Sequence, residues 1–368
     1  MPSRVLVVGA GPAGSTCAWK LASSGCGCTL VDGSTFPRGK VCGGATGART
    51  RDLLSGEGML TGAEFDRLAV RTHNVMSAYW KHDLLRTYRS PGPPVAILDR
   101  KSFDAALVDR AASAGAELVA GDRVVEVREG IALTRSGRRF TWDMLVGADG
   151  AVSTVRRSMF GRPRRRPGLG LQVTVPLPPG GDDGERGIRI HFGLVPYGYG
   201  WVFPRVSDCC IGMGALDHGL PASRLAESFA EFLLRLLGGD HPPPEGAVIP
   251  SLALHPSLGK GRVYLAGDAA GLSDQISGEG IAGAVESGFL VADSILSGDR
   301  KSMERKAAAG CVARVRLSSR YRHLLYSPLC QGHAMRRLRQ KEKFFREFWN
   351  LVSGSTGYRG MMKRFLRD

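Results

Sequence analysis

The 368-residue sequence lacks the features that mark membrane-spanning, secreted and zinc-binding chains. No apolar run reaches the roughly 18 residues needed to cross a bilayer. An apolar strand is expected within four residues of Met1, which leaves no room for a signal peptide. The 8 cysteines form no CxxC pair and none stands at a zinc-like spacing from histidine, so no metal site is expected. These absences predict a cytoplasmic chain with reduced cysteines.

Acidic residues are also scarce, and the shortage is concentrated near the C-terminus. The whole chain has 50 Lys and Arg against 34 Asp and Glu, and residues 300–368 alone have 18 against 4. No nucleic-acid-binding module accompanies this charge, so nucleic acid is not expected as a partner. A basic helical tail favours peripheral contact with the inner face of the membrane, and Arg336–Trp349 adds Phe344, Phe345, Phe348 and Trp349 to the cations. The alternative is that the cations form a solvated helix face and the aromatic residues cap the second domain.

The chain begins with a strong nucleotide-binding pattern. Arg4–Val8 predicts a buried parallel strand, a helix follows, and a second strand, Cys28–Val31, ends at Asp32. Gly9 permits a tight turn, Gly14 lets the helix pack on its strand, and Asp32 can accept both hydroxyls of an adenosine ribose. The residues expected to carry a pyrophosphate at the helix N-terminus are Gly9, Gly11, Pro12, Ala13 and Gly14.

Two more acid-bearing turns follow predicted strands, namely Asp149-Gly150 and Gly267-Asp268. The carboxyl ends of parallel strands meet at one edge, so the three turns should converge on one crevice. A nicotinamide cofactor needs only the first turn, and three turns therefore predict an extended cofactor such as FAD. Asp268 is expected to accept a ribityl hydroxyl. The segment Gly278, Gly280 and Ile281 should place a helix N-terminus near negative charge on the reduced ring.

The order of these elements predicts an α/β fold with a discontinuous first domain. We expect a Rossmann-like FAD-binding domain from residues 1–70, 98–165 and 251–300. Short alternating strands and one amphipathic helix predict a sheet-plus-helix substrate-binding domain from residues 71–97 and 166–250. Residues 301–368 should form a helical C-terminal region, broken at Pro328, Gly332 and Gly354.

Six segments together resemble the p-hydroxybenzoate hydroxylase fold and, within it, the geranylgeranyl reductase family. They are GAGPAGS, VCGG (Val41–Gly44), DRKSFD (Asp99–Asp104), GADGAVSTVRR, PYGYGWVFP and GDAAGLSDQISGEGI, spread over residues 4 to 296. The resemblance implies an FAD enzyme that reduces carbon–carbon double bonds of a polyprenyl chain on a lipid, quinone or related substrate. A hydride would reach one alkene carbon and a proton the other.

The resemblance also implies roles for individual residues. Cys42, Gly43, Gly44 and Arg100 would lie near the flavin. Tyr199, Trp201 and Phe203 would line an apolar tunnel beside the ring; the alternative is that they only fill a core. Cys42, Tyr199 and Trp201 are the catalytic candidates, and Cys42, Tyr199 or water could deliver the proton.

The chain departs from the family pattern at Asp274-Gln275-Ile276-Ser277, where the family usually has Asn-Pro-Leu-Thr or similar. Proline would fix this loop, so Gln275 is expected to free it and to offer its amide to the substrate.

Two other functions fit the same scaffold. One is an FAD-dependent monooxygenase or halogenase acting on an apolar or aromatic small molecule. The other is a flavin-bearing electron carrier or lipid-binding protein without turnover. The electron donor is left open among NADPH, a ferredoxin and a reduced quinone, because no second complete GxGxxG marks a nicotinamide site.

Overall fold

We describe a computed structural model of the chain that covers residues 4–162, 167–177, 187–216, 219–239, 241–250, 254–255, 257–355 and 358. Its first layer is a six-stranded sheet in the order β18-β19-β12-β1-β2-β8, parallel except at the β18–β19 edge. The strands are β1 (Val5–Val8), β2 (Cys28–Val31), β8 (Glu117–Val119), β12 (Met144–Gly147), β18 (Gly259–Lys260) and β19 (Val263–Leu265). The sheet therefore joins segments more than 200 residues apart, as the discontinuous domain requires.

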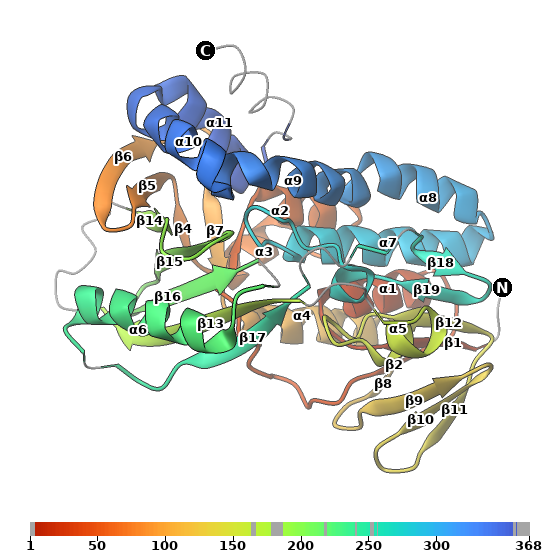
Figure 1. Cartoon of the computed structure of the whole chain (residues 1–368). Helices are drawn as coiled ribbons and strands as arrows, with labels where there is room; N and C mark the ends of the chain where they lie inside the picture. The colour runs from red at the N-terminus through yellow and green to blue at the C-terminus, as the bar shows by residue number, and fades with distance from the viewer. Residues whose placement is uncertain are drawn as a thin grey trace.

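Helices α1 (Pro12–Ser23), α4 (Arg100–Ser113) and α7 (Ile281–Ser297) pack together beside this sheet. The α1–α7 contact is close, since a Cβ on Gly288 would lie 2.1 Å from Thr16 Oγ1. Figure 1 shows a small antiparallel sheet on the other side, with α5 next to it. Its strands are β9 (Val124–Arg128), β10 (Ile131–Thr134) and β11 (Arg139–Thr141), and α5 is Thr154–Met159.

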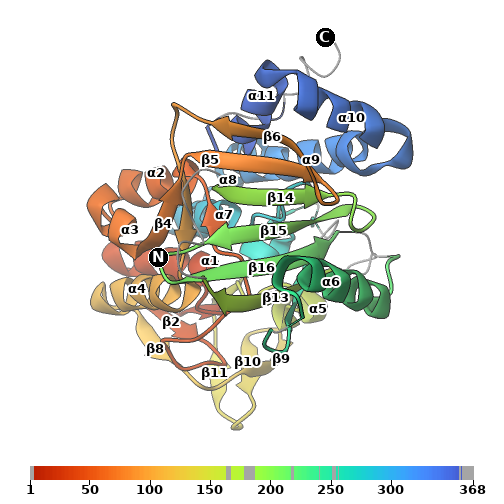
Figure 2. The same ribbon diagram turned by 90° about the vertical axis from the view of Figure 1, so that its left-hand side faces the viewer.

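The second large sheet has seven strands in the order β17-β13-β16-β15-β14-β5-β6 and is antiparallel except for the β14–β5 pair (Figure 2). Its strands are β5 (Val75–Trp80), β6 (Asp83–Arg89), β13 (Gly168–Pro176), β14 (Ile188–Phe192), β15 (Gly198–Pro204), β16 (Asp208–Ala215) and β17 (Glu245–Ile249). Helix α6 (Ala222–Leu237) covers one face through Phe229 and Leu233. Because side chains alternate along a strand, Tyr199, Trp201 and Phe203 share the opposite face of β15 while Val202 packs under α6.

A third group of elements joins the two large sheets. It contains the antiparallel sheet β3-β7-β4 and the helices α2 and α3, whose apolar side chains pack against Ile281, Val285 and Phe289 of α7. The bounds are β3 (Ala45–Thr46), β4 (Ala69–His73), β7 (Val95–Leu98), α2 (Ala48–Gly56) and α3 (Gly62–Leu68). This packing fixes the cofactor-side helix α7 relative to the second half of the molecule.

The C-terminal region is helical and runs across both halves (Figure 1). Helix α8 contacts α7, whereas α10 and α11 contact β6. Breaks occur at Pro328 and just before Gly354, as predicted, and also at Gly310 and Lys341, whereas Gly332 lies inside helix α10. The helices are α8 (Arg300–Ala309), α9 (Cys311–Tyr326), α10 (Pro328–Gln340) and α11 (Glu342–Val352).

The aromatic residues of this tail are core residues. Phe344, Phe345 and Trp349 are 0% exposed and Phe348 is 3% exposed, in one cluster with Ile190 and Phe192 of β14. These four aromatic side chains therefore pack on the second domain, which is the alternative stated above, and they are not free to enter a membrane. The cations of the same helices do face solvent, among them Lys301, Arg305, Arg316, Arg336 and Lys343. Within the described part of the chain, no helix combines the length and apolar character that a bilayer span requires.

Candidate FAD and substrate site

One large cavity, of about 610 Å³, lies between the carboxyl ends of the six-stranded sheet and the inner face of the seven-stranded sheet. This volume falls in the usual range for small-molecule sites. The cavity brings together most of the predicted site residues. They are Gly9, Gly11, Pro12, Ala13, Asp32, Cys42, Gly43, Gly44, Arg100, Asp149, Gly150, Tyr199, Trp201, Phe203, Asp268, Gly278, Gly280 and Ile281.

The β1–α1 turn forms one end of the cavity. Gly9 has φ +99°, and a Cβ there would lie 2.4 Å from the carbonyl oxygen of Ala148. The backbone N–H of Ala10 donates to Asp32 Oδ2 at 2.7 Å, so Asp32 holds the turn as well as facing the cavity. Gly14 does not line the cavity, but it has the packing role expected of it: a Cβ would lie 1.8 Å from the Gly9 carbonyl oxygen.

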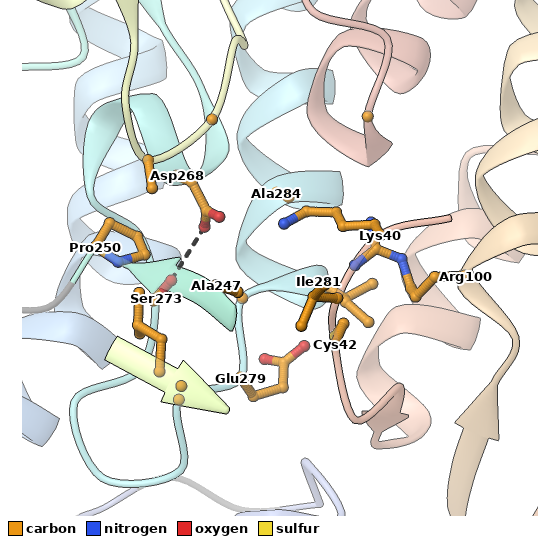
Figure 3. A pocket seen from close by; sticks show the side chains of 18 of the residues that line it. Lys40, Cys42, Arg100, Ala247, Pro250, Asp268, Ser273, Glu279, Ile281 and Ala284 are labelled. Atoms are coloured by element: carbon orange, nitrogen blue, oxygen red, sulfur yellow. Dashed lines mark hydrogen bonds between the residues drawn. The ribbon is translucent and has the colours of Figure 1, made fainter. Parts of the chain in front are cut away.

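The second and third acid-bearing turns reach the same space. Asp149 caps α5, accepting from the backbone N–H groups of Thr154 at 2.6 Å and Val155 at 3.1 Å, and burial raises the pKa of its carboxyl against these bonds. Asp268 accepts from Ser273 Oγ at 3.0 Å, as Figure 3 shows. Its neighbour Gly267 is buried behind the lining with φ +57°, so this glycine shapes the turn without facing the cavity.

A group of cations lies beside Cys42. Arg100 is 6% exposed and donates through Nε and Nη2 to the two oxygens of Asp104, each at 2.8 Å. Arg38 Nη2 lies 3.2 Å from the same carboxylate. Burial alone would lower the pKa of Arg100, but the Asp104 carboxylate raises it above its ordinary value, and the guanidinium also reaches the Cys42 side chain. Arg38 and Lys40 also line the cavity, and Figure 3 labels Lys40, although neither residue was among the predicted site residues.

The aromatic strand β15 forms the opposite wall. Trp201 and Phe203 stack with ring centroids 6.1 Å apart, and Tyr199 lies 5.9 Å from Trp201. The paired strand β16 makes room for them: Gly212 faces Trp201 in register, and a Cβ there would lie 2.1 Å from the indole ring. Gly212 was not predicted as a site residue. Glycines at alternate positions of the neighbouring strand, Gly212 opposite Trp201 and Gly214 opposite Tyr199, are the signal that could have identified it.

The loop at Asp274-Gln275 differs from the prediction. Gln275 is 0% exposed and does not line the cavity, and its Nε2 donates to the Ser273 carbonyl at 2.6 Å. The loop is also fixed without proline. The Asp274 carboxylate accepts from the N–H groups of Ile276 and Ser277, both at 2.9 Å, and three tyrosine hydroxyls hold the loop from outside, those of Tyr199, Tyr326 and Tyr358.

These surroundings fit FAD. The N-cap of helix α1 is Gly11, which has no side chain to cap the helix, so the free N–H groups of the first turn are available to a pyrophosphate at the cavity wall. Two residues that line the cavity, Arg38 and Trp201, each carry a buried donor with no hydrogen-bond partner among the described residues, namely Arg38 Nε and Trp201 Nε1. An extended polar cofactor would bind at the end formed by the β1–α1 turn, and the aromatic and aliphatic walls would remain for an apolar substrate.

Comparisons with known proteins agree with this geometry. A model of the FAD binding domain family matches residues 3–165. Geranylgeranyl diphosphate reductase of Rhodobacter capsulatus is 31% identical, over 81% of this chain and 76% of that protein. This chain belongs to the geranylgeranyl reductase family of FAD-dependent oxidoreductases. Menaquinone reductase of Mycolicibacterium smegmatis is 29% identical, over 80% of this chain and 76% of that protein.

Solved structures show how widely the fold is shared. A geranylgeranyl bacteriochlorophyll reductase-like protein of Thermoplasma acidophilum has a TM-score of 0.78 at 20% identity, covering 99% of this chain and 96% of that one. A probable FAD-dependent monooxygenase of Pseudomonas aeruginosa has a TM-score of 0.70 at 18% identity, covering 90% and 98%. At these identities the structures establish the fold of this family member and not its reaction.

Proposed function

We propose that this chain reduces carbon–carbon double bonds in a polyprenyl chain carried by a lipid, a quinone or a related molecule. The observation that supports this most is the apolar arm of the cavity beyond the aromatic strand. Its walls come from β7, β14, α9 and α11, and contribute Val95, Ile190, Phe192, Tyr326, Phe348 and Leu351. Such an arm suits a linear chain of methyl-branched isoprene units, which forms no hydrogen bonds.

Each wall has a task in this proposal. Bound FAD in its reduced form would supply a hydride equivalent to one carbon of the double bond. Tyr199, Trp201 and Phe203 would hold the prenyl chain beside the cofactor, and the aliphatic arm would exclude water that could trap a cation-like carbon. Arg38, Lys40 and Arg100 would balance negative charge at the cofactor or at a polar head group of the substrate.

The test is an anaerobic turnover assay. FAD-loaded protein is reduced with dithionite and mixed with geranylgeranyl diphosphate or with menaquinone analogues. We expect the prenyl chain to gain two hydrogens, measured by mass spectrometry, while the flavin absorbance returns. If prenyl products appear only with oxygen present and carry an added oxygen atom, the monooxygenase alternative holds instead.

We also propose that the protein contacts a membrane surface and takes its electrons from a separate donor. The exposed cations of α8 to α11 would bring the protein to anionic lipid, where prenyl substrates reside. The last ten residues of the basic tail lie outside the described residues. Co-sedimentation with anionic and neutral vesicles at low and high salt tests this contact, which should be lost in neutral vesicles.

NADPH, a ferredoxin and a reduced quinone are the electron donors to compare by the rate of flavin reduction.

A further inference from the structure

Reduction of an isolated double bond needs a proton as well as a hydride, and two hydroxyls near the cavity are committed elsewhere. Tyr199 lines the cavity, but its hydroxyl donates to the Ser277 carbonyl. Tyr326 likewise donates to the Ile276 carbonyl at 2.6 Å. Both hydroxyls thus serve to fix the loop ahead of α7.

Glu279 stands at the end of that loop and faces the cavity. Its Oε1 accepts from the backbone N–H of Ala282 at 2.8 Å and lies 3.4 Å from Thr46 Oγ1. Its Oε2 has no hydrogen bond to any other residue that the structure describes. Glu279 follows Gly278 and precedes Gly280 in the segment that leads into α7, and it lines the same cavity as Cys42 and Ile281, all three of which Figure 3 labels.

The surroundings of Glu279 favour the acid form. Burial raises the pKa of its carboxyl, and the charge of Asp274 adds to this. The Ala282 N–H bond and the cations Arg314 and Arg49 act in the opposite direction, and the net direction is upward. A carboxyl with a raised pKa beside an apolar chamber is the arrangement that general acids use.

A second, much smaller cavity lies behind Glu279. Its volume of about 10 Å³ is close to the space that one water molecule needs. Glu279 lines both cavities, so it stands between the apolar chamber and a buried polar cluster. The charged residues of this cluster come from α2, α7, α9 and the loop, and are Arg49, Asp274, Glu286 and Arg314, with Arg49 bonded to Glu286 and Arg314 Nε lying 3.6 Å from Asp274.

We propose that Glu279 is the proton donor of the reduction, and this inference rests on the proposed function. The O–H bond of Glu279 breaks and a C–H bond forms at the alkene carbon that does not receive the hydride. Both electrons added to the double bond come from the reduced cofactor, and Glu279 is left as a carboxylate. A proton from solvent then restores the acid form through the polar cluster behind it.

The first measurement is the protonation state, which needs no substrate. Infrared difference spectra of the FAD-loaded protein are recorded across a pH titration for the natural protein and for Glu279→Gln. We expect a carboxylic-acid band that persists above the ordinary range of a glutamate and is absent in the variant. A band identical in both proteins would overturn the proposal.

The second measurement separates the two half-reactions. Glu279→Gln keeps the size of the side chain and its acceptor for Ala282 N–H. We expect FAD affinity and dithionite reduction within about twofold of the natural protein, and flavin reoxidation by the prenyl substrate at least about 100-fold slower. Glu279→Asp should recover part of that rate. Glu227→Gln, on the exposed face of α6, is the matched control and should leave every rate unchanged.

The outcomes distinguish this proposal from the one on which it rests. If the natural protein is reduced but no prenyl chain reoxidises it without oxygen, the proposed function fails, and the infrared titration still decides the state of Glu279. If the natural protein turns over and Glu279→Gln reoxidises within about twofold of it, the proposed function stands and the proton donor is another group.

Discussion

The two ends of the cavity are built in different ways. At the nucleotide end the wall is mostly backbone, shaped by Gly9, Gly11 and the N-terminus of α1. At the apolar end the wall is made of side chains from distant segments, such as Val95 on β7 and Phe348 on α11. The backbone wall has no room for an added atom at Gly9, where a Cβ would lie 2.4 Å from the Ala148 carbonyl oxygen, whereas a side-chain wall can change its shape by exchange of residues. One scaffold can therefore keep a cofactor and vary its substrate.

The largest effect should come from adding one methyl group at the nucleotide end. In Gly14→Ala the new Cβ would overlap the Gly9 carbonyl oxygen, so α1 must move away from β1. We expect at least about 3 kcal/mol loss in the free energy of unfolding and loss of FAD from the purified protein. Chemical denaturation and flavin absorbance measure these two effects.

The control for that change is Gly56→Ala, at the end of α2. A Cβ there has no neighbouring atom within 4 Å, so the stability should stay the same or rise slightly. If both variants retain FAD and full stability, the nucleotide end is more adaptable than its backbone wall implies.

The second prediction concerns the loss of stability at low pH, which should arise at a buried histidine of the seven-stranded sheet. His191 on β14 is 3% exposed, stacks on Tyr79 at 4.3 Å, and has its pKa lowered to about 4, mainly by burial. The folded state thus resists protonation of His191, while the unfolded state takes up the proton near pH 6.5. The stabilisation that the neutral, buried His191 contributes is fully present above pH 6.5. It is lost as the pH falls towards 4, and the total loss in the free energy of unfolding is about 3 kcal/mol.

Denaturation curves at several pH values test this sign. The free energy of unfolding of the natural protein should fall steeply from pH 6.5 to 4. His191→Gln should be less stable at pH 7 but should show a shallower fall, and His333→Gln, at an exposed position of α10, should follow the natural protein. An equal slope in the natural protein and His191→Gln would contradict the prediction.

How much of the site the sequence predicts follows from the same contrast. The Gly9–Gly14 turn is local, so spacing along one short segment was enough to predict both its fold and the distinct roles of Gly9 and Gly14. The apolar arm is not local: Phe348 and Leu351 reach it from the tail, more than 140 residues after the aromatic strand. Periodicity predicts that such residues are buried, but not which cavity they face.

The aromatic strand is an intermediate case. Alternation along β15 predicts that Tyr199, Trp201 and Phe203 share one face, but it does not distinguish a tunnel from a filled core. The structure places all three on the cavity wall, because Gly212 across the sheet leaves room for the indole ring. Glu279 was not predicted as a site residue, because an acidic residue between two glycines is typical of an ordinary turn.

A third prediction tests whether the tail sets the length of the apolar arm. Val352, at the end of α11, lines the cavity and is half-buried. Val352→Trp should fill the arm and lower kcat/KM for geranylgeranyl substrates about tenfold relative to geranyl substrates, equivalent to about 1.4 kcal/mol. FAD affinity should not change. Val206→Trp, at a position 76% exposed, is the control. Equal losses of kcat/KM for geranyl and geranylgeranyl substrates would show that Val352 does not limit the length of the bound prenyl chain.

The smallest effect should come from restoring the proline of the family pattern. In Gln275→Pro the backbone N–H that donates to Ser318 Oγ at 2.9 Å is lost, at about 1 kcal/mol relative to Gln275→Ala, which keeps that bond. The cost should vanish when Ser318→Ala has already removed the acceptor, so a double-mutant cycle of unfolding free energies isolates the bond. If Gln275→Pro instead stabilises the protein, the loop is mobile in solution, and the hydrogen bonds around Asp274 do not replace proline as the source of its rigidity.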